Sequence, residues 1–326
     1  YGESIRTNRF ELIGSYQLPV RQLPLKLDYS LTYHNQDSFY GATNYGAEQF
    51  VLFSNLTWHK ELGKHSLLAG LTIRNDIYRD NSQAQADDNR WTPGIFIQDE
   101  WALSKSSTLL SGVRFDLQKD HGLIISPRIN FKQLLGRYTT VRLNLGTGFR
   151  RVNLFTEDHA ALTGSREVII ANELQPETSY NINLNLNHIF ILGESTGTVD
   201  LDLFYTYFNN KIVPDYETDP RYIIYDNLAG FGVSRGISMS LNPSFIIPFN
   251  YSVGITIQDV NEEENSPVDG SNLRTRQHFA PGFTGTFVAS YTHKPRQLSI
   301  ENTGKLEGPQ NLPTYEPPCN RPEAVS

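Results

Sequence analysis

Charged side chains gather in one long segment, residues 149–176, and are the first candidates for binding chemistry. They are Arg150, Arg151, Glu157, Asp158, His159, Arg166 and Glu167. Guanidinium and carboxylate groups on a loop above a rigid scaffold can bind a polar ligand. For any single residue, a solvated loop position is the favoured interpretation. For the loop as a whole we predict ligand contact, with Arg150, Arg151, Glu157, His159 and Arg166 as candidates.

The remaining polar clusters do not predict catalysis or a metal site. The eight histidines are scattered, and His159 beside Glu157 is better explained as part of a hydrated loop. Asp200 and Asp202 share one face of a predicted strand. If that face lines the water-filled interior of a barrel, the two charges are better explained by that polar environment than as a catalytic pair. The acidic run at residues 262–264 has a solvated loop as its default interpretation, with a divalent-cation or lipopolysaccharide contact as the alternative. We therefore expect no enzyme, no cofactor and no bound metal.

Composition excludes several other classes. A net charge of −7 argues against a nucleic-acid partner, which normally meets a basic stripe. The one cysteine, Cys319, excludes a disulfide framework. No apolar run approaches the roughly 20 residues that a membrane helix needs. A chain that opens on Tyr1 is expected to be part of a longer protein.

A period of two organises the chain, most plainly after Pro176. Tyr180, Ile182, Leu184 and Leu186 alternate there with Asn181, Asn183, Asn185 and Asn187. Such alternation is the pleat of a β-strand with one apolar and one polar face. It is typical of a wall between lipid and water, and equally of a half-exposed antiparallel sheet.

Fourteen segments of this kind are predicted as strands, and nothing between them has helical periodicity of useful length. They cover residues 9–18, 25–34, 49–61, 65–78, 94–104, 108–118, 124–134, 137–148, 177–190, 197–209, 231–242, 249–260, 278–293 and 297–306. The chain is thus predicted to be all-β. Alternating segments of about 10 residues are the signature of transmembrane β-strands. Asp99 and Arg235 break the alternation, and we place them where a strand end meets the membrane interface.

The connections alternate between short and long. Short ones fall at residues 19–24, 62–64, 105–107, 135–136, 191–196, 243–248 and 294–296, and long ones at 35–48, 79–93, 149–176, 210–230 and 261–277. Residues 119–123 are the one modest member of the long set. An up-and-down antiparallel wall puts alternate connections on opposite rims, and outer-membrane barrels have tight periplasmic turns and long extracellular loops.

Aromatic residues fall near these predicted rims. They are Tyr16, Tyr33, Trp58, Tyr78, Trp101, Tyr138, Tyr205, Tyr207, Phe249 and Tyr291. Tyr and Trp concentrate where an apolar body meets a wet edge. We predict an interfacial girdle, ahead of aromatic cross-strand pairing in a soluble sheet.

Several motifs resemble those of the TonB-dependent receptors of Gram-negative outer membranes. They are GTGFR (residues 146–150), NLF with Glu157 (153–157), LQPE with Ser179 and Asn181 (174–181), the NKIVPDYETDPRYIIYDNL segment ending at Leu228, SRG (234–236) and GPQNLPTYEPP (308–318). The family landmarks are Gly146, Gly148, Phe149, Asn153, Leu154, Pro176, Glu177 and Asn181. Landmarks at a strand–loop junction more often serve the fold than the ligand.

This resemblance implies a fold, a location and a function. The family forms a barrel of about 22 strands around an N-terminal plug. Residues 1–326 are therefore expected to be a partial antiparallel up-and-down transmembrane β-barrel of about 14 strands. The plug and the TonB-contacting region would precede Tyr1, and the last strands would follow. Such a piece alone is expected neither to close nor to transport.

The implied protein is an active-transport receptor in the Gram-negative cell outer membrane. It would import a scarce ferric siderophore, haem, cobalamin or glycan, with TonB, outer-membrane lipid and lipopolysaccharide as partners. Two alternatives stay open at this point. One is a passive outer-membrane channel or adhesin-like barrel, and the other is a soluble β-rich binding module or glycoside hydrolase.

Overall fold

The structure is a computed structural model that describes residues 3–20, 24–40, 43–81, 88–119, 121–150, 167–172, 174–216, 218–219, 221–244, 248–265 and 272–313. Its strands are β1 (Glu3–Gln17), β2 (Leu25–Tyr40), β3 (Thr43–Leu62), β4 (His65–Asp80), β5 (Asp88–Ala102), β6 (Ser107–Gln118), β7 (Gly122–Leu135), β8 (Thr139–Arg150), β9 (Glu167–Ile170), β10 (Glu177–Leu192), β11 (Ser195–Asn209), β12 (Ile212–Asp215), β13 (Tyr222–Asn227), β14 (Gly230–Ser244), β15 (Phe249–Asn265), β16 (Asn272–Arg276), β17 (Phe283–His293) and β18 (Leu298–Glu307). One short 3-10 helix, η1 (Lys294–Arg296), lies in the last turn. No helix among these residues is long and apolar enough to cross a membrane.

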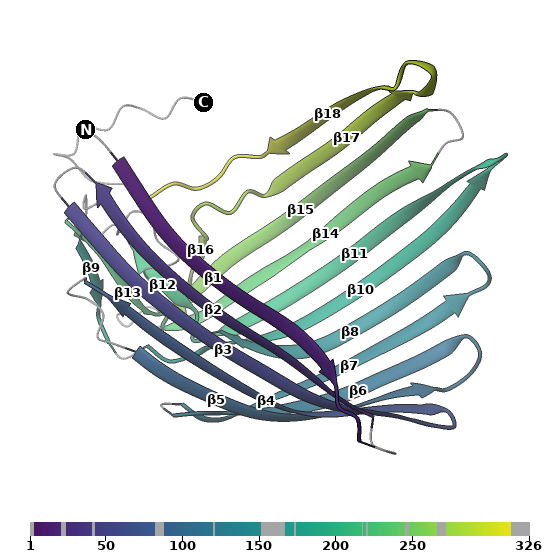
Figure 1. The fold of residues 1–326 in the computed structure, drawn as a ribbon. Helices are drawn as coiled ribbons and strands as arrows, with labels where there is room; N and C mark the ends of the chain where they lie inside the picture. Colours follow the sequence, from purple (N-terminus) through teal and green to yellow (C-terminus); the bar gives the residue numbers. More distant parts are fainter. Residues whose placement is uncertain are drawn as a thin grey trace.

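One curved antiparallel sheet dominates the molecule (Figure 1). Its strands pair in the order β1-β2-β3-β4-β5-β6-β7-β8-β10-β11-β14-β15-β17-β18, and β16 adds to β15 beyond β17. The sheet is not closed, because β1 and β18 are its two edges. Each of the fourteen path strands overlaps one of the fourteen predicted segments, with several strands up to six residues longer at the loop-rim end, so the prediction of an all-β up-and-down wall is confirmed.

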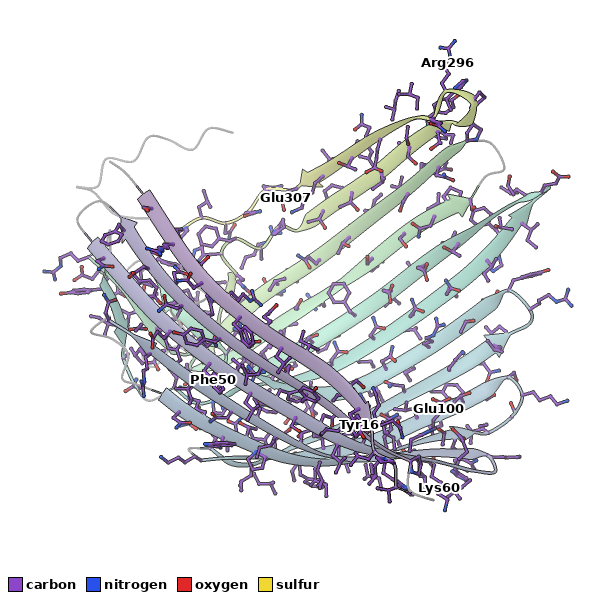
Figure 2. All side chains as sticks on the ribbon, in the orientation of Figure 1. Tyr16, Phe50, Lys60, Glu100, Arg296 and Glu307 are labelled. Atoms are coloured by element: carbon purple, nitrogen blue, oxygen red, sulfur yellow. The ribbon has the colours of Figure 1, made fainter. Side chains whose placement is uncertain are left out.

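The register puts like residues side by side across the sheet. Leu184 lies opposite Leu143 and Leu203, and Asn183 lies opposite Asn144. Side chains project from both faces of the curve (Figure 2). The apolar ones are widely exposed: Leu184 is 40% exposed and Ile257 is 61% exposed. In a soluble protein, such an apolar face would be covered by packing against other elements. This sheet instead exposes one apolar face.

The opposite face is held together by hydrogen bonds between side chains. Arg142 Nη1 donates to Asn185 Oδ1 at 3.0 Å, and Asn185 Nδ2 donates to Asp202 Oδ1 at 3.0 Å. Asn187 Nδ2 donates in the same way to Asp200 Oδ1, at 2.7 Å. The asparagine row thus links three neighbouring strands, and the two aspartates are acceptors within it rather than a separate pair. Such satisfied amides explain why asparagine, a poor strand former, is tolerated here.

The two polar residues that interrupt the apolar face have partners. His65 Nδ1 lies 2.7 Å from Asp99 Oδ2, and the His65 ring stacks on Trp101 with centroids 5.3 Å apart. Arg235 Nη2 lies 3.0 Å from Asp259 Oδ2. Pairing lowers the cost of placing a charge on an otherwise apolar surface.

The two rims differ in their connections, but the predicted long connection 35–48 is wrong: β2 extends to Tyr40 and β3 begins at Thr43, which leaves two residues between them. Tight turns follow β3, β7 and β10, where Gly63, Gly136 and Gly193 have positive φ angles of 64°, 77° and 63°. Figure 2 labels Tyr16, Lys60 and Arg296 along this turn rim. The opposite rim, from which the long connections leave, is called the loop rim below.

The structure corrects three details of the sequence prediction. The long connections contain four short strands that alternation did not reveal, β9, β12, β13 and β16. β17 starts at Phe283 rather than residue 278, because Phe279 has a φ of 59° and cannot continue a strand. Tyr78 is not part of an exposed girdle: it is 4% exposed, and its hydroxyl hydrogen-bonds that of Tyr45 at 2.6 Å.

Candidate functional site

A three-stranded sheet folds over the loop rim, in the order β12-β13-β9, with β13 and β9 parallel. We call it the cap. Its buried side chains are Ile212, Ile223 and Tyr225, with Leu174 and Tyr216 packed against them. The cap therefore joins two connections, residues 149–176 and 210–230, into one packed unit.

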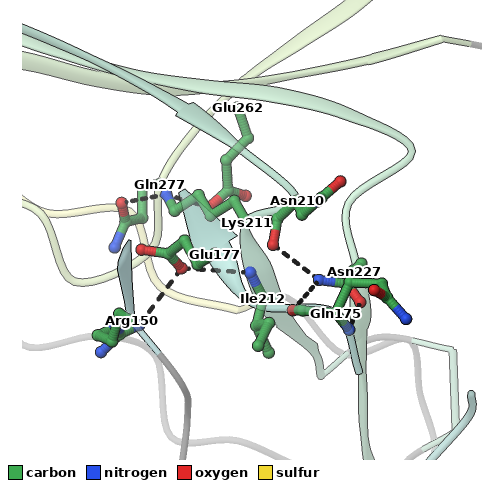
Figure 3. Close-up of polar contacts among 9 residues, drawn as sticks. All are labelled: Arg150, Gln175, Glu177, Asn210, Lys211, Ile212, Asn227, Glu262 and Gln277. Atoms are coloured by element: carbon green, nitrogen blue, oxygen red, sulfur yellow. Dashed lines mark hydrogen bonds and ion pairs between the residues drawn. The ribbon is translucent and has the colours of Figure 1, made fainter. Parts of the chain in front are cut away.

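Asn227 fastens the two connections to each other (Figure 3). Its Nδ2 donates to the backbone carbonyls of Gln175 at 3.1 Å and Asn210 at 2.7 Å. Its Oδ1 accepts the backbone N–H of Gln175 at 2.7 Å. One amide side chain thus satisfies three backbone groups that no strand pairs.

Two buried charges fasten the cap to the wall (Figure 3). Glu177, 6% exposed, accepts hydrogen bonds from Arg150 Nη2 at 3.4 Å and from the backbone N–H of Ile212 at 3.3 Å. Lys211, 9% exposed, donates from Nζ to Glu262 Oε1 at 2.8 Å and to Gln277 Oε1 at 2.7 Å. A charge buried this far is tolerated only with such partners.

One exposed pair in the same connection has a resolved electrostatic effect. The side chain of Arg221, and then its backbone N–H, hydrogen-bond the carboxylate of Asp219 and lower its pKa to about 2. The Arg221 side chain is 75% exposed and the Asp219 side chain 27% exposed, so this pair orders the turn before β13 while both groups stay in contact with solvent.

A polar recess lies on the hydrogen-bonded face near the loop rim. It encloses about 490 Å³ and is lined by Gln49, Phe53, Thr72, Arg74, Asp76, Tyr78, Arg90, Thr92, Arg114, Asp116, Gln118, Phe149 and Arg150. Four arginines thus face two aspartates. We call this the arginine recess.

The centre of the arginine recess is a fork between Arg114 and Asp116. Arg114 Nε lies 2.6 Å from Asp116 Oδ2, and Nη2 lies 2.5 Å from Oδ1 and 2.9 Å from Thr72 Oγ1. Asp116 is 1% exposed, so its charge is neutralised by this bidentate pair. The glycine at position 94 provides the space for this fork, because a Cβ there would overlap the Asp116 carboxylate and the Thr72 hydroxyl.

A second pair lies nearer the loop rim. Arg74 Nη2 lies 3.0 Å from Asp76 Oδ2, and Gln49 Nε2 donates to Asp76 Oδ1 at 3.2 Å. Toward the turn rim, a second cavity of about 380 Å³ shares Thr72 and Arg114 and adds Arg128, which hydrogen-bonds Gln98. Arginine therefore recurs on consecutive strands from β4 to β8 along one face.

The residues singled out from sequence divide into three groups. Arg151, Asn153, Leu154, Glu157, His159 and Arg166 lie outside the described residues. Arg150 lines the arginine recess and pairs with Glu177, while Gly146, Gly148 and Phe149 on β8 lie opposite Asn181, Ser179 and Thr178 on β10. Pro176 lies just before β10. The landmark motifs, far apart in sequence, are therefore next to each other in the sheet.

The arginines at 74, 90 and 114 were not singled out from sequence. Arg74 and Arg114 belong to predicted alternating strands, on the polar side of the alternation. Arg90 falls in the predicted connection 79–93, which the structure corrects because β5 begins at Asp88. Two features of the sequence could have identified Arg74 and Arg114: their position on the polar side of the strand alternation, and their closeness to a long connection. Among the described residues, no group of three or more His, Cys, Asp or Glu side chains is placed to hold a metal ion.

Comparison with known proteins decides the family. The sequence profile of the TonB dependent receptor-like β-barrel family matches residues 4–312. The chain belongs to this family. Membership fits the wall of fourteen strands, its two unlike faces and its two unlike rims.

The similar proteins include a siderophore receptor and a hemophore receptor. The iron-regulated outer membrane virulence protein of Vibrio cholerae is 32% identical over 162 residues, which cover 46% of this chain and 24% of that protein. The crystal structure of the siderophore receptor PirA from Pseudomonas aeruginosa aligns with a TM-score of 0.66 at 17% identity, over 94% of this chain and 54% of PirA. The Serratia marcescens hemophore receptor HasR, solved with its hemophore HasA and heme, aligns with a TM-score of 0.69 at 15% identity, over 95% of this chain and 59% of HasR. The chain thus spans about a quarter of that curated relative and little more than half of these solved structures.

Proposed function

We propose that this chain is the barrel wall of a TonB-dependent outer-membrane receptor that imports a scarce substrate. The observation that carries the proposal is the contrast between the faces of one curved sheet. Exposed leucine and isoleucine on one face suit acyl chains, and hydrogen-bonded Asn, Asp and Arg on the other suit a hydrated lumen. The cap lies at the rim where substrate would enter.

The proposed mechanism divides capture from translocation. The loops and the arginine recess bind the substrate, and the folded cap holds the loops in place for that contact. Energy for release would come from TonB through an N-terminal plug preceding this segment. Support for a longer parent protein comes from the relatives, of which this chain covers only part.

An iron-bearing substrate is the best supported of the four that the family resemblance implies. The named relatives include an iron-regulated protein, a siderophore receptor and a hemophore receptor. We therefore propose a ferric siderophore or haem ahead of cobalamin or a glycan. The exposed apolar face would contact outer-membrane lipid, with the Arg235–Asp259 pair near the headgroups.

Growth under iron limitation tests the proposal. A strain deleted for the full-length gene should lose growth on one or more ferric chelates or haem, and a strain lacking TonB should show the same loss. Complementation with the wild-type gene should restore growth only where TonB is present. Uptake that persists without TonB would instead support a passive channel.

A further inference from the structure

We propose that an apolar groove on the outer face of the wall, near the turn rim, binds a zwitterionic phospholipid. One acyl chain lies in the groove, and the ammonium and phosphate of the headgroup meet Asp99 and Lys60. The lipid belongs to the periplasmic leaflet, since the tight turns of outer-membrane barrels face the periplasm. This inference rests on the membrane location in the proposed function and is independent of the substrate that the receptor transports.

The groove is a hollow in the exposed apolar face. It encloses about 420 Å³, within the range of small-molecule sites, and apolar residues from β2 to β6 line it. Ala69 forms its floor, because the strand register places this small side chain directly between Trp58 and Ile97. Leu71 continues the lining one row nearer the loop rim. A small side chain between two large ones leaves a depression in which an acyl chain can lie.

The next row toward the turn rim carries two opposite charges. In that row Leu67 lies opposite Lys60 on β3 and opposite Asp99 on β5. Each of the three is two residues from a member of the floor row, so all three share the outer face. Neighbouring strands lie about 4.8 Å apart, so a cation and an anion flank the end of the groove with their Cα atoms about 10 Å apart. Figure 2 shows Lys60 at the turn rim.

The carboxylate of Asp99 has an acceptor that the described residues leave unused. Its Oδ2 lies 2.7 Å from His65 Nδ1, whereas its Oδ1 is shielded from solvent and accepts no hydrogen bond from any described residue. The side chain is nevertheless 29% exposed, and rotation about its Cβ–Cγ bond brings either oxygen toward the open side. A carboxylate oxygen without a donor is costly on a surface that faces lipid, so an ammonium group from the membrane would stabilise it.

Lys60 supplies the opposite charge. Its side chain is exposed, and within the described part of the chain it forms no ion pair. The adjacent acid, Glu61, is on the lumen side of β3, where it accepts a hydrogen bond from Ser66. A long lysine side chain at a strand end reaches the phosphate layer of a membrane. A headgroup with both charges therefore satisfies Lys60 and Asp99 together, whereas an anionic lipid satisfies only Lys60.

Aromatic rings place the charged row at the membrane interface. Trp101 is 41% exposed and stacks on His65, with ring centroids 5.3 Å apart. Trp58 lines the groove from the other side. Because indole rings concentrate at the level of the headgroups, the charged row lies where phosphate and amine groups are found, and the groove lies where acyl chains are found.

Charge complementarity distinguishes the phospholipid from other occupants of an apolar face. Lipopolysaccharide lies in the opposite leaflet, and its phosphates would offer no cation to Asp99. A second copy of the chain would remove both Lys60 and Asp99 from solvent, which is costly for unpaired charges. We therefore commit to the phospholipid, and contact between copies is an outcome that the experiment can return.

The test is native mass spectrometry of the purified full-length receptor, released from detergent after titration with single lipids. The probes are phosphatidylethanolamine, which carries both charges, and phosphatidylglycerol with the same acyl chains, which carries only the phosphate. Phosphatidylethanolamine should bind the wild type at least about tenfold more tightly. Asp99→Asn should weaken the binding of phosphatidylethanolamine at least about tenfold and leave that of phosphatidylglycerol almost unchanged, because only the first lipid brings an ammonium group.

Three further variants separate the parts of the site. Lys60→Gln should weaken the binding of both lipids, because both carry a phosphate. Ala69→Phe should also weaken both, since the ring fills the floor of the groove, and it keeps the outer face apolar so that the barrel still assembles. Glu100→Gln is the matched control: it removes a carboxylate one residue from Asp99 on the lumen side, and should leave lipid binding unchanged. Heat-modifiable gel mobility confirms that each variant is folded.

The proposal is overturned if the wild type binds phosphatidylglycerol as tightly as phosphatidylethanolamine, or if Asp99→Asn binds phosphatidylethanolamine as well as Glu100→Gln does. It is also overturned if Ala69→Phe leaves lipid binding intact, or if it dissociates a dimer that holds no lipid. Lipid binding as described, in a receptor whose uptake persists without TonB, would reject the transport mechanism and keep this inference. TonB-dependent uptake by a receptor that does not distinguish the two lipids would do the reverse.

Discussion

Asp116 illustrates how this thin wall accommodates a buried charge. Its carboxylate is 1% exposed, accepts two hydrogen bonds from Arg114, and lies against a glycine on the neighbouring strand β5. Removing one partner of such a pair costs more than the pair contributes, because the remaining charge stays desolvated. The Arg114–Asp116 fork is therefore best probed by crowding it rather than by neutralising it.

Gly94→Ala should destabilise the wall by about 1–3 kcal/mol, since the new methyl group must displace the Asp116 carboxylate or Thr72 from a packed position. The measurement is the temperature at which the full-length protein loses its heat-modifiable gel mobility. Gly146→Ala is the control on the same face, because its Cβ would meet Arg128 Cβ at an ordinary 3.7 Å. Equal effects of the two substitutions would contradict the assigned packing.

Among the secondary-structure elements, the cap depends on a few polar contacts for its position. Lys211→Met should loosen it, because Glu262 would be left as a poorly solvated carboxylate, at a cost of about 2–3 kcal/mol. Amides of β13 should then exchange with deuterium faster, while those of β10 stay protected. Lys305→Met removes an exposed pair with Glu307 and should cost less than about 1 kcal/mol. Unchanged exchange in β13 would show that the Lys211 contacts do not hold the cap.

The fourteen long strands could be predicted from sequence because each has one face in each environment, which enforces a period of two. The cap strands could not be predicted, because a segment of four to six residues is too short to show a period of two clearly. Their pairing also joins Glu167 to Tyr222, far apart in the chain. Tyr78 was misplaced because its type, suited to a girdle, outweighed its parity, which it shares with Thr72 and Arg74 on the polar face. The same parity could have identified Arg74 and Arg114, which were not singled out from the sequence.

At the scale of the whole molecule, the two faces of the wall should respond differently to the same substitution. Leu184→Arg puts a charge on the exposed apolar face midway along β10, and should cost about 2–4 kcal/mol in a bilayer. Asn183→Arg puts the same side chain on the hydrated face one residue away, and should assemble almost as well as the wild type. The amount of heat-modifiable protein in outer-membrane fractions reports both. A reversed order would mean that the asparagine face meets lipid.

The open edges of the sheet lead to the last prediction. Among the residues that the structure describes, β1 and β18 each pair on one side only, so each presents a row of backbone N–H and C=O groups with no strand beside it. In a bilayer every such group costs several kcal/mol, since lipid offers no hydrogen bond. Residues 1–313 expressed alone should therefore aggregate or remain unassembled, without heat-modifiable mobility, whereas the full-length receptor should show it. A detergent-soluble, heat-modifiable monomer of the segment would mean that β1 and β18 can close on each other, and the wall would then be a small barrel in its own right rather than part of a larger one.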